Sequence, residues 1–260
     1  MHTLEQFTYR TSPRNKAEGT MPTESLGLRN ATELVARIQP DAMATLAERA
    51  RTYVPAVRAE VDELSAALAT NPRAIARRAL LFGLSTPNND ERDSVAWSTA
   101  AYPHFGTLSP VELSEIWYPS PVTGTPTRVG IRTELAAGLA DIYRDFSDAV
   151  PADLTPERLE RVRHIGPKVA RMITAVANPD ARVFTVDLWH ARQLLWAADL
   201  EYRARVSVSP IAYPMLEQVW LDYRDQYFSD QPTWVCQWAT WDAANGRHEP
   251  HRQLWADLAA

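Results

Sequence analysis

The chain has 260 residues, a formal net charge of −5 and hydrophobic residues at 45% of its positions. This composition is typical of a globular protein with a substantial core and excludes a mostly disordered one. No apolar run approaches the roughly 18 residues of a membrane span. The single cysteine, Cys236, excludes an internal disulfide framework and a four-cysteine iron–sulfur cluster. The N-terminus lacks the apolar core of a secretory signal, so we expect a cytoplasmic protein.

Residues 1–30 are polar with scattered Pro, Gly and Thr, and they predict an irregular N-terminal arm. From Ala31 onward the pattern is helical almost throughout, which predicts one all-α domain over residues 31–260 with roughly ten helices. One apolar stripe steps by four, three and four residues through Val57, Val61, Leu64 and Leu68. The only strand-like run is the short segment Val183–Val186.

Several predicted helices begin with one chemistry, an oxygen-bearing side chain followed by proline. These pairs are Asn71-Pro72, Ser109-Pro110, Thr155-Pro156 and Ser209-Pro210. The first residue suits the N-cap and the proline suits the first helical position. Further helices are marked by Leu135, Leu139, Ile142 and Phe146, and by Trp234, Trp238 and Trp241.

Lys168 stands out in the stretch Leu159–Leu195. Of 27 basic residues only Lys16 and Lys168 are lysines. A lysine amine becomes a nucleophile when it is desolvated, whereas an arginine guanidinium stays protonated. Because Lys168 is predicted in the first turn of a helix beside apolar residues, we expect an environment that favours its neutral form. The alternative is a solvated surface lysine.

Asp187 lies 19 residues after Lys168, at another predicted helix start. It suits the N-cap of the helix that follows, and its carboxylate could also accept a proton or stabilise a cation. The tight turn before Lys168 leaves backbone N–H groups unpaired, and these suit a phosphate. Nearby basic residues add to this, although such a charge run also fits a solvated helix face.

The segments Val162–Ala170 and Val183–Arg192 together resemble the helix–hairpin–helix and aspartate signature of the endonuclease III superfamily of DNA glycosylases. The Gly166-Pro167-Lys168 form is most similar to the 8-oxoguanine glycosylase branch. Clear resemblance covers about 65 residues, from Gly130 to Leu195, with the hairpin at about 158–178. It implies a two-lobed all-α fold with an active-site cleft between the lobes.

This resemblance implies a role for each matched residue. Lys168 would attack C1′ of a flipped nucleotide, Asp187 would assist it, and β-elimination would follow, which makes a bifunctional DNA glycosylase and AP lyase. The hairpin would bind DNA through Arg163, His164, Ile165, Gly166 and Arg171. Asn88 and Asn89, in a polar loop that otherwise reads as a helix cap, match the wedge that fills the vacated space. Trp189 and His190 are candidates for the base pocket.

Two positions depart from the family pattern. His164 replaces the first hairpin glycine, and a histidine with positive φ costs more than a glycine. Arg171 replaces an acidic residue frequent in the 8-oxoguanine branch, which argues against oxidised guanine as the substrate.

The expected partner is double-stranded DNA with a damaged or modified base, bound by a monomer without membrane contact. The implied location is the cytoplasm, in association with the nucleoid, for a bacterial or phage-encoded protein. No metal or cluster is expected, apart from a monovalent or divalent ion that the hairpin could hold. Two alternatives remain: a DNA-binding module that has lost its chemistry, and a same-fold transferase that acts on hypermodified phage DNA bases.

Overall fold

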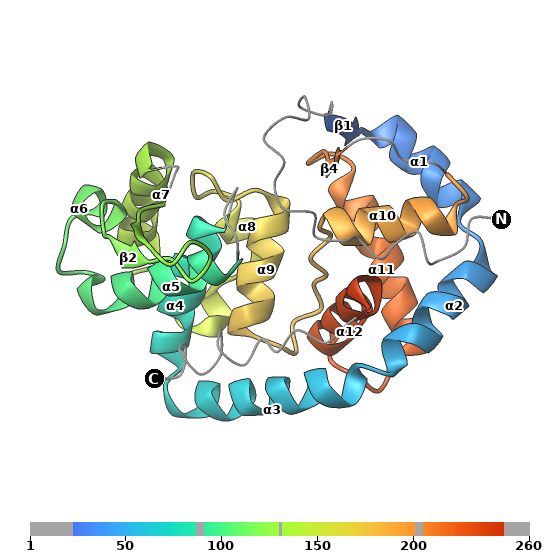
Figure 1. The fold of residues 1–260 in the computed structure, drawn as a ribbon, viewed down its shortest axis with the longest axis horizontal. Helices are drawn as coiled ribbons and strands as arrows, with labels where there is room; N and C mark the ends of the chain where they lie inside the picture. The colour runs from blue at the N-terminus through green and yellow to red at the C-terminus, as the bar shows by residue number, and fades with distance from the viewer. Residues whose placement is uncertain (1–22, 87–90, 130–131, 201–204, 247–260) are drawn as a thin grey trace. The chain divides into compact units, whose positions relative to one another are not determined.

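The computed structural model describes residues 23–86, 91–129, 132–200 and 205–246 (Figure 1). Within these ranges the protein is mostly helical, with twelve α-helices and four short strands, so the predicted all-α class is confirmed. The chain divides into two compact units. The first comprises Met1–Ala59 and Arg182–Glu249, and the second comprises Glu60–Ala181 and Pro250–Ala260. No helix in the described ranges combines the length and apolarity that a membrane span requires.

The first unit is built around the last three helices of the chain. Its elements are β1 (Thr23–Leu26), α1 (Leu28–Arg37), α2 (Pro40–Arg51), α10 (Leu188–Ala197), β4 (Arg205–Val208), α11 (Tyr213–Tyr227) and α12 (Thr233–Asn245). α2 packs on α12, and α1 contacts both α10 and α11. The core includes fully buried Trp220 and Trp234, with Phe184 stacked on Trp220 at a centroid distance of 5.2 Å.

The prediction of an irregular arm over residues 1–30 is wrong at its C-terminal end. β1 pairs in parallel with β4, with Thr23 opposite Arg205 and Leu26 opposite Val208. α1 then begins at Leu28. The local sequence pattern does not reveal this strand pairing, because the two strands lie far apart in the sequence. Residues 1–22 lie outside the described residues.

The second unit contains the segment that the sequence predicted to form the hairpin. Its elements are α4 (Pro72–Ser85), α5 (Glu91–Ala101), the 3-10 turn η2 (Tyr102–His104), α6 (Pro110–Ser114), β2 (Tyr118–Pro119), β3 (Pro126–Thr127), α7 (Arg132–Asp145), the 3-10 turn η3 (Pro151–Asp153), α8 (Pro156–Leu159) and α9 (Pro167–Ala177). The helix α3 (Val54–Thr70) runs through the boundary between the units in sequence. The predicted stripe on it is confirmed at Val57, Val61 and Leu64, which are buried.

The predicted helix starts have different outcomes. Asn71 accepts a hydrogen bond from Ala74 N, and Ser109 forms a full capping box with Glu112, so both caps are confirmed. Thr155 occupies the N-cap of α8 without a side-chain hydrogen bond. α11 begins at Tyr213, later than predicted, because Ser209 caps the turn before it and accepts from Ala212 N.

Close helix packing positions α9 in the second unit. α4 lies against α9 at Gly83, where a Cβ atom would come within 2.2 Å of Ile173 Cγ1. Only glycine permits that approach without displacing the isoleucine. The face of α9 turned to the core carries Ala170, Ile173 and Val176, which are fully buried. α9 is therefore held along its apolar face, and its N-terminal turn projects from that anchored body.

Candidate functional site

The hairpin consists of α8, a turn over residues 160–166, and α9. Three apolar residues, Leu159, Val162 and Ile165, are buried and tie the turn to the second unit. His164 between them has a φ of 69°. This is the left-handed region, which favours glycine, and the sequence departure at this position therefore falls where a β-carbon is costly. The histidine side chain itself is exposed.

Asp141 on α7 fixes the shape of the turn. Its carboxylate accepts hydrogen bonds from the Arg163 backbone N at 3.0 Å, from Nε at 2.9 Å and from Nη2 at 3.0 Å. The Arg163 side chain, then its backbone N–H and its charge, hold the pKa of the Asp141 carboxyl far below its usual range. One helical turn earlier on α7, Gly138 leaves room for the turn, since a Cβ there would lie 2.9 Å from Arg163 O.

The start of α9 has no side-chain cap. Gly166 occupies the N-cap with extended backbone, φ −88° and ψ 178°, and Pro167 follows at the first helical position. The first backbone hydrogen bond of the helix joins Ala170 N to Gly166 O at 3.0 Å. The N–H groups of Gly166, Lys168 and Val169 precede that bond and meet no acceptor in the described part of the chain. They form a row of donors at the positive end of the helix dipole.

Lys168 is exposed in the first turn of α9. The expected desolvation of its amine is therefore not seen, because the apolar neighbours of Lys168 in sequence turn toward α4 and the core. Val169 and Ala170 are buried while Lys168 projects from the opposite side of the helix.

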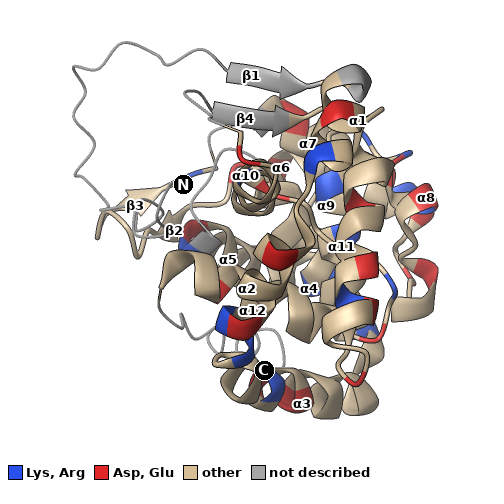
Figure 2. Cartoon of the chain, turned by 90° about the vertical axis from the view of Figure 1, so that its right-hand side faces the viewer, with Lys and Arg blue, Asp and Glu red and all other residues tan. Residues whose placement is uncertain are grey.

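Two predicted DNA contacts carry ion pairs inside the second unit. Arg163 binds Asp141, and Arg171 binds Glu160. The Arg171 side chain is only 13% exposed, so its charge is largely committed to the turn. Arg158, Arg161 and Lys168 are further exposed cations of the hairpin. Basic and acidic positions are interspersed over the helices (Figure 2).

The strand-like run Val183–Val186 forms no strand in the structure. It is an extended segment whose backbone N–H groups bind side chains of α11 and α12 instead of another strand. Phe184 N donates to Glu217 Oε1 at 3.1 Å, Thr185 N to Gln237 Oε1 at 2.7 Å, and Val186 N to Tyr213 Oη at 2.8 Å. These three bonds fix the backbone that leads directly into Asp187.

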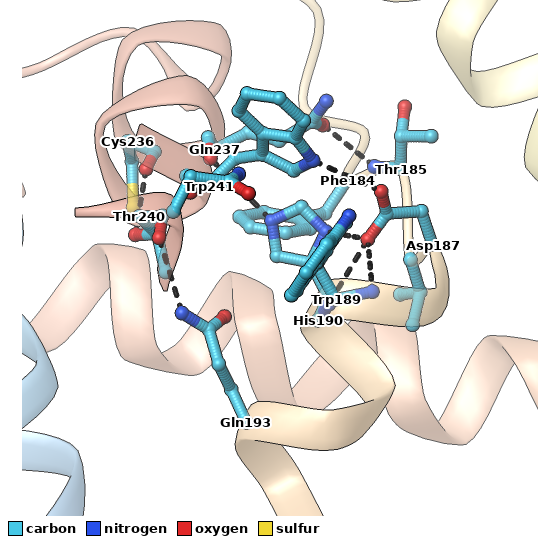
Figure 3. A network of polar contacts seen from close by, with 12 residues as sticks. Phe184, Thr185, Asp187, Trp189, His190, Gln193, Cys236, Gln237, Thr240 and Trp241 are labelled. Atoms are coloured by element: carbon cyan, nitrogen blue, oxygen red, sulfur yellow. Dashed lines mark hydrogen bonds and ion pairs between the residues drawn. The ribbon is translucent and has the colours of Figure 1, made fainter. Parts of the chain in front are cut away.

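Asp187 is the N-cap of α10, as the sequence predicted. Its Oδ1 accepts from Trp189 N at 2.8 Å and from His190 N at 3.0 Å. His190 Nδ1 lies 2.8 Å from the same oxygen, and Trp241 Nε1 donates to Oδ2 at 3.2 Å (Figure 3). The carboxylate is 18% exposed, so it reaches the surface of the first unit while four donors hold it.

His190 does not line a surface pocket of the first unit. It is only 2% exposed, and its ring meets Phe184 and Trp220 edge to face at 5.0 and 5.3 Å. Its role in the structure is to hold Asp187. Trp189 is half-buried with the Arg192 guanidinium 5.3 Å from its ring centroid, so it remains the candidate closer to solvent.

The two catalytic candidates belong to different units, Lys168 to the second and Asp187 to the first. Asn88 and Asn89 lie outside the described residues. Ser85, three residues before Asn88, is the buried last residue of α4. Sequence reasoning missed Asp141 as the residue that holds the turn.

Sequence reasoning also missed Trp241, Gln237 and Tyr213 as the residues that hold the aspartate and its segment. No local signal marks these partners, although Trp241 stood out as part of a tryptophan series on one predicted helix. In the described ranges, no group of three or more His, Cys, Asp or Glu residues is arranged to hold a metal ion.

Comparison with protein-family models, with curated proteins and with solved structures finds no match to this chain.

Proposed function

We propose that this protein is a DNA glycosylase with AP lyase activity, in which Lys168 is the nucleophile and Asp187 its carboxylate partner. The substrate is duplex DNA that contains a damaged or modified base. Flipping such a base out of the stack costs a few kcal/mol, and least when its pairing is already weakened.

The chemistry follows from an amine and a carboxylate at one sugar. The Lys168 amine attacks C1′, the bond between C1′ and the base nitrogen breaks, and its electron pair leaves with the base, which takes up a proton. The sugar ring then opens to a protonated Schiff base as O4′ gains a proton. Loss of a proton from C2′ expels the 3′ phosphate oxygen, and the strand is nicked. Asp187 supplies the negative charge that stabilises the cationic sugar.

The observation that carries the proposal is the start of α9. An uncapped row of backbone N–H groups follows a left-handed residue, and an exposed lysine stands in the same helical turn. The donors suit a phosphate of the DNA backbone, and contacts of this kind position a duplex without reading its sequence. A lysine one residue into that turn would then be carried to the sugar next to the bound phosphate.

The defining experiment is borohydride trapping on duplex DNA that contains an abasic site. Reduction converts the Schiff base into a stable bond, so the wild-type protein should form a covalent complex with the DNA. Lys168→Ala should abolish the complex while its thermal unfolding changes by no more than about 0.5 kcal/mol, because the side chain is exposed.

Lys168→Arg is the matched control because it keeps the positive charge and removes the amine nucleophile. It should bind abasic DNA as the wild type does and still fail to trap it. Trapping that persists in Lys168→Ala would refute the assignment of the nucleophile. Wild-type binding without any trapping, on abasic DNA and on a panel of oxidised, deaminated, alkylated and hypermodified bases, would favour a DNA-binding module.

A further inference from the structure

The contacts of Asp187 exceed what a helix cap requires. A cap needs its side-chain oxygen to accept from one or two N–H groups of the first turn, and Trp189 N and His190 N fulfil that. The Trp241 indole and the His190 imidazole add nothing to the cap, yet both bind the same carboxylate. We propose that Trp241 and His190 are positioning residues that set the orientation of the Asp187 carboxylate for catalysis. This inference rests on the function proposed above.

The two oxygens of Asp187 have different tasks. Oδ1 accepts three hydrogen bonds, from two backbone N–H groups and from His190 Nδ1. These three donors surround Oδ1 and leave little room for a further group beside it. A cationic sugar would therefore meet the carboxylate at Oδ2, the oxygen that Trp241 contacts at 3.2 Å. Trp241 thus acts on the oxygen that faces the reaction.

The His190 ring is locked in one orientation. Because an ionised carboxylate only accepts hydrogen bonds, Nδ1 carries the hydrogen in the contact with Asp187. Phe184 and Trp220 pack edge to face on the ring. The ring cannot turn without losing these contacts, so it holds Asp187 Oδ1 next to the first turn of α10.

The Trp241 indole is held by its own helix. Trp238 packs on it edge to face at 5.5 Å, and Trp234 packs on Trp238 in the same way at 5.3 Å. Gln237 on the same helix accepts a hydrogen bond from Thr185 N. α12 therefore binds both the segment that leads into Asp187, through Gln237, and the Asp187 carboxylate, through Trp241 (Figure 3).

The test for Trp241 compares the same substitution, tryptophan to phenylalanine, at two positions of the chain. Trp241→Phe removes the N–H donor and keeps an aromatic ring. Trp97→Phe is the matched control, since Trp97 is a fully buried tryptophan of α5 in the second unit whose indole N–H meets no acceptor in the described part of the chain. The readout is the single-turnover rate constant for trapping abasic DNA. That rate constant does not depend on the fraction of folded protein, whereas the amplitude does.

We expect Trp241→Phe to lower the rate constant about tenfold to a hundredfold with unchanged DNA affinity, because small misplacements of catalytic groups have effects of this size. Trp97→Phe should stay within about twofold of the wild type. Equal rate constants in the two variants would overturn the role of Trp241.

The test for His190 uses its conservative variant and its tautomer. His190→Asn retains a donor near the position of Nδ1 and should keep most of the rate, whereas His190→Leu should lose it.

Independently of DNA, nitrogen NMR of the wild type should show His190 protonated at Nδ1. A hydrogen on Nε2 alone would overturn the inference even in an active enzyme. If the wild type traps no DNA, the proposed function fails and the catalytic inference falls with it, while the NMR result still reports whether the contact exists.

Discussion

Two helices that begin within the same short stretch of the chain differ in how the unpaired N–H groups of their first turns are bound. α9 begins after Gly166 and α10 after Asp187, both with extended backbone at the N-cap. The first N–H groups of any helix lack partners inside the helix. At α10 the Asp187 side chain accepts two of them, whereas at α9 no side chain does so.

The difference indicates what each helix start is suited to bind. The donors of α10 hold a carboxylate that belongs to the protein, so a negative charge stays in place permanently. The donors of α9 remain available for an anion from outside. The residue at the N-cap accounts for this difference. An oxygen-bearing side chain at position 166 would cap α9 as Asp187 caps α10.

The largest effect on DNA binding should come from giving α9 a side-chain cap like that of α10. Gly166→Asp places a carboxylate at the N-cap of α9, where a Cβ meets nothing within 4 Å. It should stabilise the fold by roughly a few tenths of a kcal/mol through capping, because glycine is itself a tolerated N-cap residue. It should also weaken binding to duplex DNA about tenfold to a hundredfold, because a charge-assisted contact of about 1.5 to 3 kcal/mol is replaced by repulsion. Thermal unfolding and a binding titration measure the two changes.

Gly166→Ser separates capping from charge. Serine caps as well as aspartate but carries no charge, so its effect on DNA binding should be smaller than that of Gly166→Asp. If both variants bind DNA like the wild type, the start of α9 does not hold a phosphate.

A middle-sized effect should come from the residue that shapes the turn. Asp141→Asn leaves an oxygen for Arg163 N but removes the charge that the Arg163 guanidinium binds at Nε and Nη2. We expect a loss of about 1 to 2 kcal/mol in the free energy of unfolding, since hydrogen bonds to charged groups are worth about that much and Arg163 is partly solvated. Chemical denaturation of both proteins measures it.

The same residue predicts how stability depends on pH. The pKa of Asp141 is lowered in the folded state, so the folded protein binds fewer protons there than the unfolded chain. Its contribution is therefore fully present above the ordinary carboxyl pKa of 3.8 and is lost as the pH falls below it. The difference in stability between wild type and Asp141→Asn should shrink as the pH is lowered from 6 to about 3. A difference that stays constant over this range would contradict the ion pair.

The smallest effect should come from relieving the left-handed residue. His164→Gly removes a β-carbon at a φ of 69°. The left-handed conformation costs a non-glycine residue about 1 to 2 kcal/mol, and glycine costs about 0.5 to 1 kcal/mol in unfolded-chain entropy. The net result should be a gain in stability of about 0.5 to 1 kcal/mol by thermal unfolding. A loss of stability would mean that the exposed histidine makes contacts that offset its backbone cost.

The same two helix starts show how far sequence reasoning reaches. The N-cap role of Asp187 and the sensitive position of His164 could be predicted, because each depends on residues within one helical turn. So could the caps at Asn71 and Ser109, for the same reason. Local spacing determines which backbone N–H groups lack partners, and residue type determines which side chains can meet them.

The partners that hold these features could not be predicted. Arg163 meets Asp141 on α7, and Asp187 meets Trp241 across 54 residues of chain. The run Val183–Val186 has the composition of a strand, yet its hydrogen bonds go to side chains because no strand of the first unit lies beside it within the described residues. The exposure of Lys168 likewise depends on which face of α9 turns to α4. These outcomes are decided by tertiary packing, which local pattern does not encode.

The way the segment before Asp187 is anchored also sets an order of events during synthesis. Its three backbone amides bind Tyr213, Glu217 and Gln237, all of which leave the ribosome after Asp187 itself. Chains emerge from the N-terminus, so the nascent protein can complete the hairpin while the aspartate still lacks every one of these supports. The carboxylate acquires its final geometry only when α12 has been made. A chain that stops before α12 would thus retain the lysine and its turn and lack a fixed acid.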